Sequence, residues 1–213
     1  MENSLKKARQ ELVDLWRKQG FSHKFIDTFM SIPRENFVLE KDRWQAYGDY
    51  PLSVGYGQTI SQPTTVMLML KWLELRDGIK VLEIGAGSGY NAALLGRIIG
   101  DKGKVYSVEI VPELVEVAKR NLNEIDVKNV EAIFGDGSKG YEKEAPYDRI
   151  VVSCACPEEV LGVLVGQLKI GGVLVAPLGG YPQVMTRVRK LKGGNVEREE
   201  FGDFVFVPLR GGR

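Results

Sequence analysis

The strongest constraint on the fold is an alternation of short apolar runs and longer helical segments that begins after Gly78. Apolar runs with the length of β-strands occur at 80–84, 104–108, 130–134, 149–153 and 172–177. Segments with helical spacing separate most of them, at 90–99, 112–125 and 158–168. Parallel strands need long crossover connections, which are usually helices, so this alternation predicts an α/β, Rossmann-like fold. We therefore expect a doubly wound, mostly parallel sheet with helices on both faces.

The C-terminal part of the chain extends this sheet. Two β-rich stretches, 183–191 and 197–209, flank the turn-forming residues Gly193-Gly194-Asn195. This pattern predicts an antiparallel C-terminal hairpin. Together with the five apolar runs, the hairpin gives a seven-stranded sheet.

The N-terminal part lacks the alternation and predicts a helical extension. Apolar residues at helical spacing indicate a first helix between Ser4, as its N-cap, and Gly20, and a second, shorter helix after Ser22. From 47 to 63, repeated Gly and Pro predict a long loop without regular elements. Pro63 suits the first turn of a third helix.

Charge and residue usage exclude several classes of protein. Lys and Arg number 29 and Asp and Glu 28, so the net charge is +1, and we expect no nucleic-acid partner. The longest apolar stretches, 66–70 and 173–178, are far shorter than the roughly 20 residues of a membrane span. The polar N-terminus lacks a secretory signal, which favours a cytoplasmic protein. One histidine and two cysteines predict no metal site and no His-dependent nucleophile.

A glycine-rich turn follows the first apolar run. Gly85, Gly87 and Gly89 alternate between that run and the next helical segment, directly after Glu83. Glycine permits positive φ and lets a ligand lie against the main chain. Dinucleotide enzymes use GxGxxG, whereas this chain has GxGxG preceded by an acid, so a zwitterionic amino-acid ligand fits better. A tight turn without a ligand remains the alternative.

Acidic residues follow the next two apolar runs. Glu109 comes after the second run, where its carboxylate would accept hydrogen bonds from ribose hydroxyls, and Asp136 with Gly137 comes after the third, beside an adenine edge. Solvated strand ends would show the same acids. Taken together, residues 78–180 resemble the class I methyltransferases, which implies S-adenosyl-L-methionine as the cofactor.

The acceptor of the methyl group is predicted from the lack of a base. Amine-methylating relatives commonly carry an Asn-Pro-Pro-Tyr type segment after the fourth strand, where this chain has Ser153-Cys154-Ala155-Cys156-Pro157. A carboxylate, with a pKa near ~4, needs no deprotonation at neutral pH. The sequence therefore favours a carboxylate acceptor.

Four segments extend the resemblance over nearly the whole chain. They are 47–63, 146–152, 168–172 with 175–177, and 206–209. They closely resemble the protein-L-isoaspartate O-methyltransferases, which methylate the α-carboxylate of isoaspartyl residues in age-damaged proteins and so initiate repair. The resemblance implies that Gln58, Thr59, Ile60 and Ser61 lie across the methionine end of the cofactor, and that Ser61 is the catalytic residue. A simple cap of the helix near Pro63 is the alternative role of Ser61.

Two positions depart from this family's pattern. Thr64 stands where many members have His, and Val205 where many archaeal and bacterial members have Arg. Both departures bear on how the protein binds its substrate. Whether D-aspartyl residues are also methylated stays open. The alternatives are a methyltransferase for RNA or another small molecule, a non-catalytic binding module, and a dinucleotide dehydrogenase.

The expected organisation is a single domain over 1–213, acting as a monomer. Residues 1–77 would supply the N-terminal helices and the active-site loop, 78–180 the cofactor-binding core, and 181–213 the C-terminal hairpin.

Overall fold

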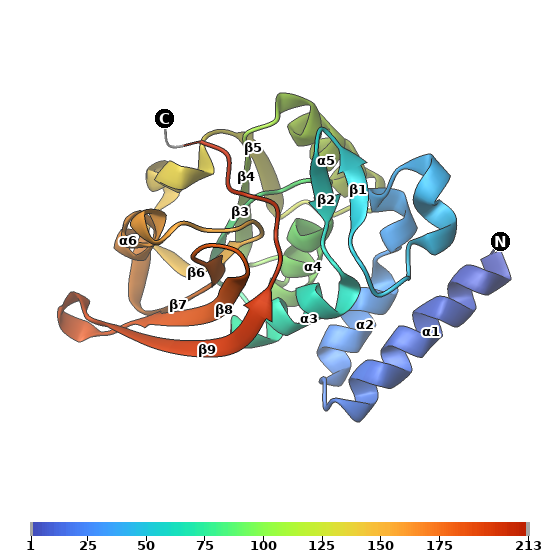
Figure 1. The fold of residues 1–213 in the computed structure, drawn as a ribbon, viewed down its shortest axis with the longest axis horizontal. Coiled ribbons are helices and arrows are strands. Elements are labelled where there is room, and N and C mark those ends of the chain that lie inside the picture. Colours follow the sequence, from blue (N-terminus) through green and yellow to red (C-terminus); the bar gives the residue numbers. More distant parts are fainter. Residues whose placement is uncertain (1, 212–213) are drawn as a thin grey trace.

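The computed structural model of the chain describes residues 2–211. Within these residues, seven strands form one sheet in the order β5-β4-β3-β6-β7-β8-β9 (Figure 1). Their bounds are β3 Lys80–Ile84, β4 Lys104–Glu109, β5 Val130–Phe134, β6 Tyr147–Val152, β7 Leu168–Leu178, β8 Gln183–Lys190 and β9 Val196–Phe204. Strands β3 to β7 pair in parallel, whereas β8 and β9 are antiparallel to their neighbours. This arrangement confirms the predicted Rossmann-like sheet.

Helices cover both faces of the sheet. Their bounds are α1 Glu2–Lys18, α2 His23–Ser31, α3 Pro63–Trp72, α4 Tyr90–Ile99, α5 Pro112–Glu124 and α6 Glu158–Gly166. Side chains alternate between the two faces along each strand. In β3, Val81 belongs to the core cluster that includes α1 to α5, whereas Leu82 and Ile84 belong to the cluster that includes α6.

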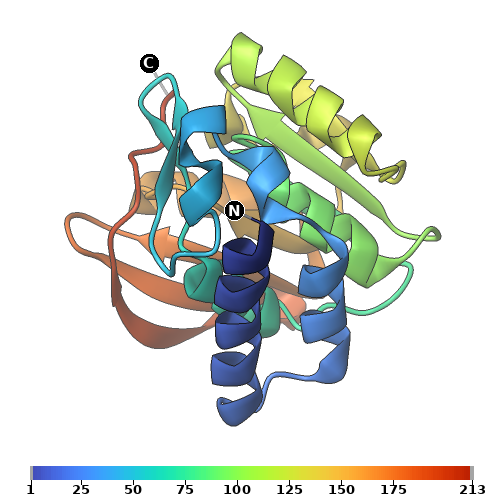
Figure 2. The same ribbon diagram turned by 90° about the vertical axis from the view of Figure 1, so that its right-hand side faces the viewer.

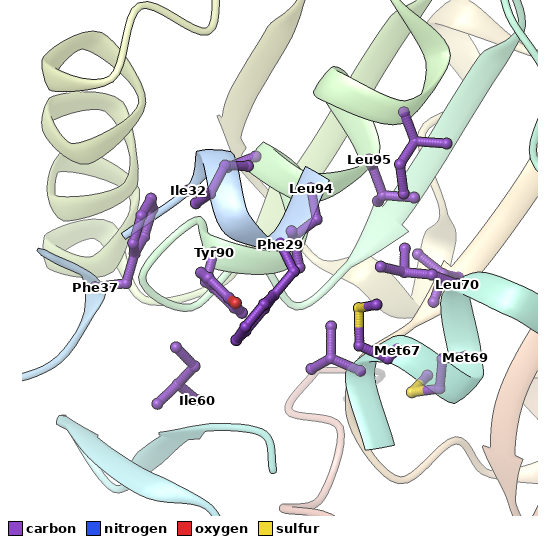
Figure 3. Close-up of a cluster of buried hydrophobic side chains, with 14 of the residues drawn as sticks. Phe29, Ile32, Phe37, Ile60, Met67, Met69, Leu70, Tyr90, Leu94 and Leu95 are labelled. Carbon is purple, nitrogen blue, oxygen red and sulfur yellow. The ribbon is translucent and has the colours of Figure 1, made fainter. Parts of the chain in front are cut away.

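The N-terminal extension packs against α4 through a shared apolar cluster. Figure 3 shows Phe29 of α2 and Tyr90 of α4 close together, with Ile60 below them. Ile60 belongs to the long loop 47–63, here called the active-site loop. Phe29, Ile60 and Tyr90 are buried, with exposed fractions of 1%, 6% and 2%. Burial of each such side chain contributes about 1.5–3 kcal/mol. The loop is therefore fixed to the same core as the sheet.

Three local predictions were wrong. Helix α1 begins at Glu2, so Ser4 lies inside it and is not its N-cap. The long loop contains a hairpin, β1 Leu52–Gly55 and β2 Gln58–Ile60, because the residues that argued against regular structure form its tight turn. Gly55 and Gly57 both have positive φ there. The last β-rich stretch ends at Phe204 and not at 209.

Smaller shifts affect the ends of other elements. Helix α6 ends at Gly166, and β7 begins at Leu168, four residues earlier than the predicted run. None of the helices within residues 2–211 combines the length and the apolar character needed to cross a bilayer.

Candidate active site

The glycine-rich turn connects β3 to α4. Gly85, Gly87 and Gly89 have φ values of +91°, +52° and +87°, a backbone conformation that residues with a side chain rarely adopt. A Cβ added at Gly89 would lie 3.1 Å from the Cβ of Ala118, so this glycine permits close packing of α4 against α5. A Cβ added at Gly87 would meet nothing within 4 Å. Gly87 thus leaves its backbone open to a ligand.

A small cavity, here called the first cavity, lies beside this turn. It is lined by Thr59, Ile60, Ser61, Val66, Met69, Gly85, Ala86, Gly87, Ser88, Tyr90, Asn91 and Ser153. Ser88 Oγ, Tyr90 Oη and Asn91 Oδ1 are buried and have no hydrogen-bond partner among the described residues. Each unpaired buried polar atom costs about 1–3 kcal/mol. Three residues of this lining carry such an atom, which supports a site for a polar ligand here.

A second cavity continues from Gly85 toward the end of β4. Its lining is Gln58, Ile84, Gly85, Val108, Glu109, Ile110, Gly137, Cys154, Pro208, Leu209 and Arg210. Gly137 follows β5, and a Cβ there would collide with Ile84, so glycine is required for this close approach. Asp136 caps the short helix η3, Gly137–Lys139, by accepting a bond from Ser138 N at 3.0 Å.

Glu109 joins the glycine turn to the second cavity. Its Oε2 accepts a hydrogen bond from Gly87 N at 2.9 Å, and its Oε1 accepts from Ile110 N and Val111 N at 2.9 and 3.0 Å. A carboxylate offers about four acceptor positions, so capacity remains for a ligand hydroxyl. Glu109 is therefore placed to hold the turn and to bind a ligand.

Glu83 lies deeper, in β3, and lines neither cavity. Its carboxylate accepts hydrogen bonds from Ser107 Oγ at 2.5 Å and Asn91 Nδ2 at 2.6 Å, and a longer one from Ser153 Oγ at 3.3 Å. Burial raises the pKa of Glu83 to about 7, against the lowering effect of these donors. Because the carboxylate takes the amide nitrogen of Asn91, the amide oxygen is left for the first cavity.

An open groove of about 630 Å³, here called the acceptor groove, borders the active-site loop. Its lining is Pro51, Thr59, Ser61, Gln62, Thr65, Pro182, Asp203, Phe204, Val205, Phe206 and Val207. Thr59 and Ser61 also line the first cavity. These two residues form a wall shared by the cavity and the groove.

The capping role considered for Ser61 does not fit the helix that follows it. The N-cap of α3 is Gln62, without a side-chain cap bond. The first turn is instead held by Asp49, whose carboxylate accepts from Thr64 N at 2.9 Å and from Thr64 Oγ1 at 2.8 Å. The Ser61 side chain is thus not needed as a cap.

The structure distributes the predicted site residues over these spaces. Thr59, Ile60, Ser61, Gly85 and Gly87 line the first cavity, and Gln58, Gly85, Glu109 and Gly137 line the second. Glu83, Gly89 and Asp136 line neither and lie beside or beneath them. Their direct contact with a ligand stays a prediction.

The C-terminal segment contributes residues that sequence reasoning missed. Both backbone groups of Ala155 bond to this segment: its N–H donates to Val207 O at 2.8 Å, and its carbonyl accepts from Leu209 N at 3.1 Å. Figure 2 shows the segment beside the β1–β2 hairpin, and a Cβ added at Gly57 would lie 3.0 Å from Arg210 Nη2. Two sequence signals pointed to this segment: the family resemblance of 206–209, and Pro208, which argues against a continuous strand.

Comparison with known proteins identifies the family. The profile of the protein-L-isoaspartate(D-aspartate) O-methyltransferases matches residues 6–213. The chain belongs to this family. A relative from Methanosarcina mazei, named protein-L-isoaspartate O-methyltransferase, is 45% identical over 99% of this chain and 86% of its own length. Another, from Archaeoglobus fulgidus, named protein-L-isoaspartate O-methyltransferase 2, is 47% identical over 95% of this chain and 93% of its own.

Solved structures agree with this assignment. A protein-L-isoaspartate O-methyltransferase aligns with a TM-score of 0.86 and 32% identity over 95% of this chain and 66% of its own, so that protein is longer. A putative member from Plasmodium falciparum, in complex with S-adenosyl-L-homocysteine, has a TM-score of 0.82 at 24% identity, over 95% of this chain and 98% of its own. The second match supports the fold alone.

The family depends on S-adenosylmethionine, and the residues of this site fit that cofactor. The unpartnered oxygens of Ser88, Tyr90 and Asn91 suit its amino-acid end. The open backbone at Gly87 leaves room beside the turn. Glu109 suits the ribose, which carries two hydroxyl donors.

Replacing Glu109 with glutamine tests the ribose assignment. The amide has a single oxygen, which cannot accept from three backbone N–H groups and a ribose hydroxyl, so the turn loosens and the ribose loses its charged partner. We expect cofactor affinity to fall about tenfold, because a hydrogen bond to a charged group contributes ~1.5–3 kcal/mol and the amide keeps part of it. Calorimetric titration with S-adenosylmethionine measures the change. Unchanged affinity would contradict the assignment.

Proposed function

We propose that the chain transfers a methyl group from S-adenosylmethionine to the α-carboxylate of L-isoaspartyl residues in damaged proteins, the first step of their repair. The observation that carries this proposal is the wall formed by Thr59 and Ser61, which lies between the first cavity, beside the glycine turn, and an open groove. A substrate in the groove would meet the cofactor at this wall.

The chemistry of the acceptor groove suits a peptide. Apolar side chains such as Phe204 and Phe206 provide most of its surface, and Gln62 and Thr65 offer hydrogen-bonding groups. Val205 lines the groove, so no cation is present at the position where many relatives have Arg. Asp203 is the charged residue of this lining, so we expect peptide binding to depend on shape and hydrogen bonds, without a cation for the substrate carboxylate.

The second departure, Thr64, has another role. Its Oγ1 accepts a hydrogen bond from Trp16 Nε1 at 2.9 Å and donates to Asp49. Thr64 thus links α1 to the active-site loop and does not line the groove. At the position where many relatives have His, Thr64 therefore forms hydrogen bonds that connect α1 with the active-site loop.

The proposed reaction needs positioning and exclusion of water, and no base. When bound, S-adenosylmethionine supplies an electrophilic methyl group, which an ionised carboxylate accepts directly. His23 is exposed at the start of α2 and lines neither cavity nor groove. Ser61 would orient the carboxylate through its hydroxyl, and the active-site loop would shield the site from water.

Matched peptides test the substrate. We expect methylation of a peptide that contains L-isoaspartate and no methylation of its normal L-aspartyl twin. In isoaspartate the α-carboxylate hangs from the main chain on an arm one methylene shorter than a β-carboxylate, so a narrow wall can distinguish them. Transfer of labelled methyl groups measures both rates, and a D-aspartyl peptide makes a third arm. Equal rates on the first two would reject the repair function and retain the methyltransferase.

The same proposal includes a cytoplasmic monomer without a nucleic-acid partner. A net charge of +1 supports the lack of nucleic-acid binding. Cys154 and Cys156 are both free, which suits a reducing compartment. Light scattering over a range of concentrations tests the monomer.

A further inference from the structure

Arg34 is a buried cation whose role the proposed reaction leaves unexplained. It begins the short helix η1, Arg34–Phe37, and its exposed fraction is 0%. Removing a charged group from water is expensive unless it is well hydrogen-bonded. Among the described residues, no carboxylate forms an ion pair with Arg34; its side chain donates to two main-chain carbonyls through Nε and Nη2, and its Nη1 is buried without a partner. A buried guanidinium without a carboxylate partner costs stability, so we expect Arg34 to have a role in the site.

The two carbonyls lie at opposite ends of the active-site loop. Arg34 Nε donates to Ala46 O at 2.8 Å, and Arg34 Nη2 donates to Ser61 O at 2.8 Å. The segment between these residues contains the β1–β2 hairpin. A planar guanidinium holds its donors at fixed relative angles, so it fixes both carbonyls relative to each other.

The same guanidinium also contacts the first cavity's lining. Its Cζ lies 5.0 Å from the centre of the Tyr90 ring, in a cation–π arrangement. Tyr90 is the first residue of α4, directly after the glycine turn. Arg34 thus touches the loop that carries Ser61 and the helix that follows the cofactor turn.

We infer that Arg34 is a positioning residue, which fixes the Ser61 peptide so that the Ser61 hydroxyl stays at the wall between cavity and groove. The inference rests on the proposed role of Ser61 in orienting the carboxylate. Hydrogen bonding to Ser61 O restrains the backbone that carries this side chain. Loss of the restraint should lower the rate of methyl transfer more than it weakens cofactor binding.

The variant Arg34→Lys keeps the charge and removes the fork of donors. A lysine can reach one of the two carbonyls but not both in fixed geometry. We expect kcat for an isoaspartyl peptide to fall about tenfold to a hundredfold, with less than about a threefold change in cofactor affinity. Calorimetric titration with S-adenosylmethionine gives the fraction of folded protein, to which kcat is normalised. If Arg34→Lys does not fold, Arg34→Gln takes its place.

Arg9→Lys is the matched control. Arg9 Nη2 also donates to two carbonyls, those of Phe29 and Ile32, at 2.8 and 3.2 Å, and its guanidinium lies over the rings of Phe29 and Tyr47. None of these contacts involves Ser61. We expect Arg9→Lys to lower the melting temperature and to leave kcat near the parent value.

A double-mutant cycle with Ser61→Ala separates positioning from general weakening. If Arg34 acts through Ser61, the double variant Arg34→Lys with Ser61→Ala turns over at the rate of Ser61→Ala alone. Multiplied losses, or a parent-like rate for Arg34→Lys, would overturn the inference. A parent-like rate for Ser61→Ala would reject the role of Ser61 and this inference together. The parent protein's rate on the isoaspartyl peptide tests the proposed function separately.

Discussion

Ser61→Ala is expected to lower kcat about tenfold to a thousandfold, with little change in the affinity for S-adenosylmethionine. Ser61 belongs to the wall that the first cavity shares with the acceptor groove, and its hydroxyl is proposed to act there. There it would orient the substrate carboxylate, whereas the cofactor has many other contacts. Methyl transfer to an isoaspartyl peptide gives kcat, and calorimetry gives the affinity.

A loss of stability must be separated from this effect. Ser53→Ala is the matched control, because Ser53 lies in β1 of the hairpin that directly precedes Ser61, where its Oγ accepts a hydrogen bond from Gly55 N at 3.2 Å, and does not line the groove. Both variants should melt near the parent temperature, since Ser61 caps no helix. If Ser61→Ala melts, binds cofactor and turns over like the parent, Ser61 has no part in the reaction.

The central sheet could be predicted because parallel strands covered on both faces appear as continuous apolar runs. The structure gives the predicted bounds for β3, Lys80–Ile84, and for α4, Tyr90–Ile99. Their local signals were strong: buried apolar runs, and glycine or proline at the boundaries. Where a glycine had two interpretations, as at Gly55 and Gly57, the sequence could not separate a loop from a two-stranded hairpin.

The cofactor side of the site could also be predicted, because one edge of a parallel sheet collects all the carboxyl ends of its strands. Glu109 ends β4, Gly137 follows β5, and both line the same cavity. Arg34 and Arg210 gave no such signal. They reach the site through contacts between segments far apart in the chain, to Ser61 and beside Gly57, and no local pattern encodes those.

Glu83, in β3 directly before the glycine turn, was predicted to bind the cofactor. The structure places it beneath the glycine turn, where it fixes Asn91 through a hydrogen bond of 2.6 Å. The order of residues alone places Glu83 next to the turn. Which face of the strand its side chain takes, and what it meets there, depends on the packing of the sheet. The sequence could not distinguish contact with the ligand from support of a residue that lines the cavity.

Burial of Glu83 is expected to make stability depend on pH in an unusual direction. Burial raises its pKa from 4.5 to about 7, so the folded protein binds this proton more tightly than the unfolded chain does. The free energy of unfolding therefore falls as pH rises from about 4.5 to about 7, and is level above that range. At ~1.4 kcal/mol for each pKa unit, the loss is about 3 kcal/mol.

Asp148 contributes in the opposite direction and outside this window. Burial alone would raise its pKa, but hydrogen bonds from Lys169 and the backbone of Lys80 hold it below the ordinary value of 3.8. Its stabilisation is thus present above about pH 4 and is lost only as pH falls further. Measurements from pH 4.5 upward isolate the effect of Glu83.

Glu83→Gln should abolish the decrease in stability between pH 4.5 and 7. Glutamine keeps the shape of the side chain and an oxygen that accepts from Asn91, and the hydroxyls of Ser107 and Ser153 can turn to accept from its amide nitrogen. The variant should be more stable than the parent at pH 8, by up to about 3 kcal/mol, and similar to it near pH 4.5. Urea unfolding without cofactor, at a series of pH values, measures both proteins. Parallel curves for parent and variant would show that Glu83 is ionised throughout, with its three donors outweighing its burial.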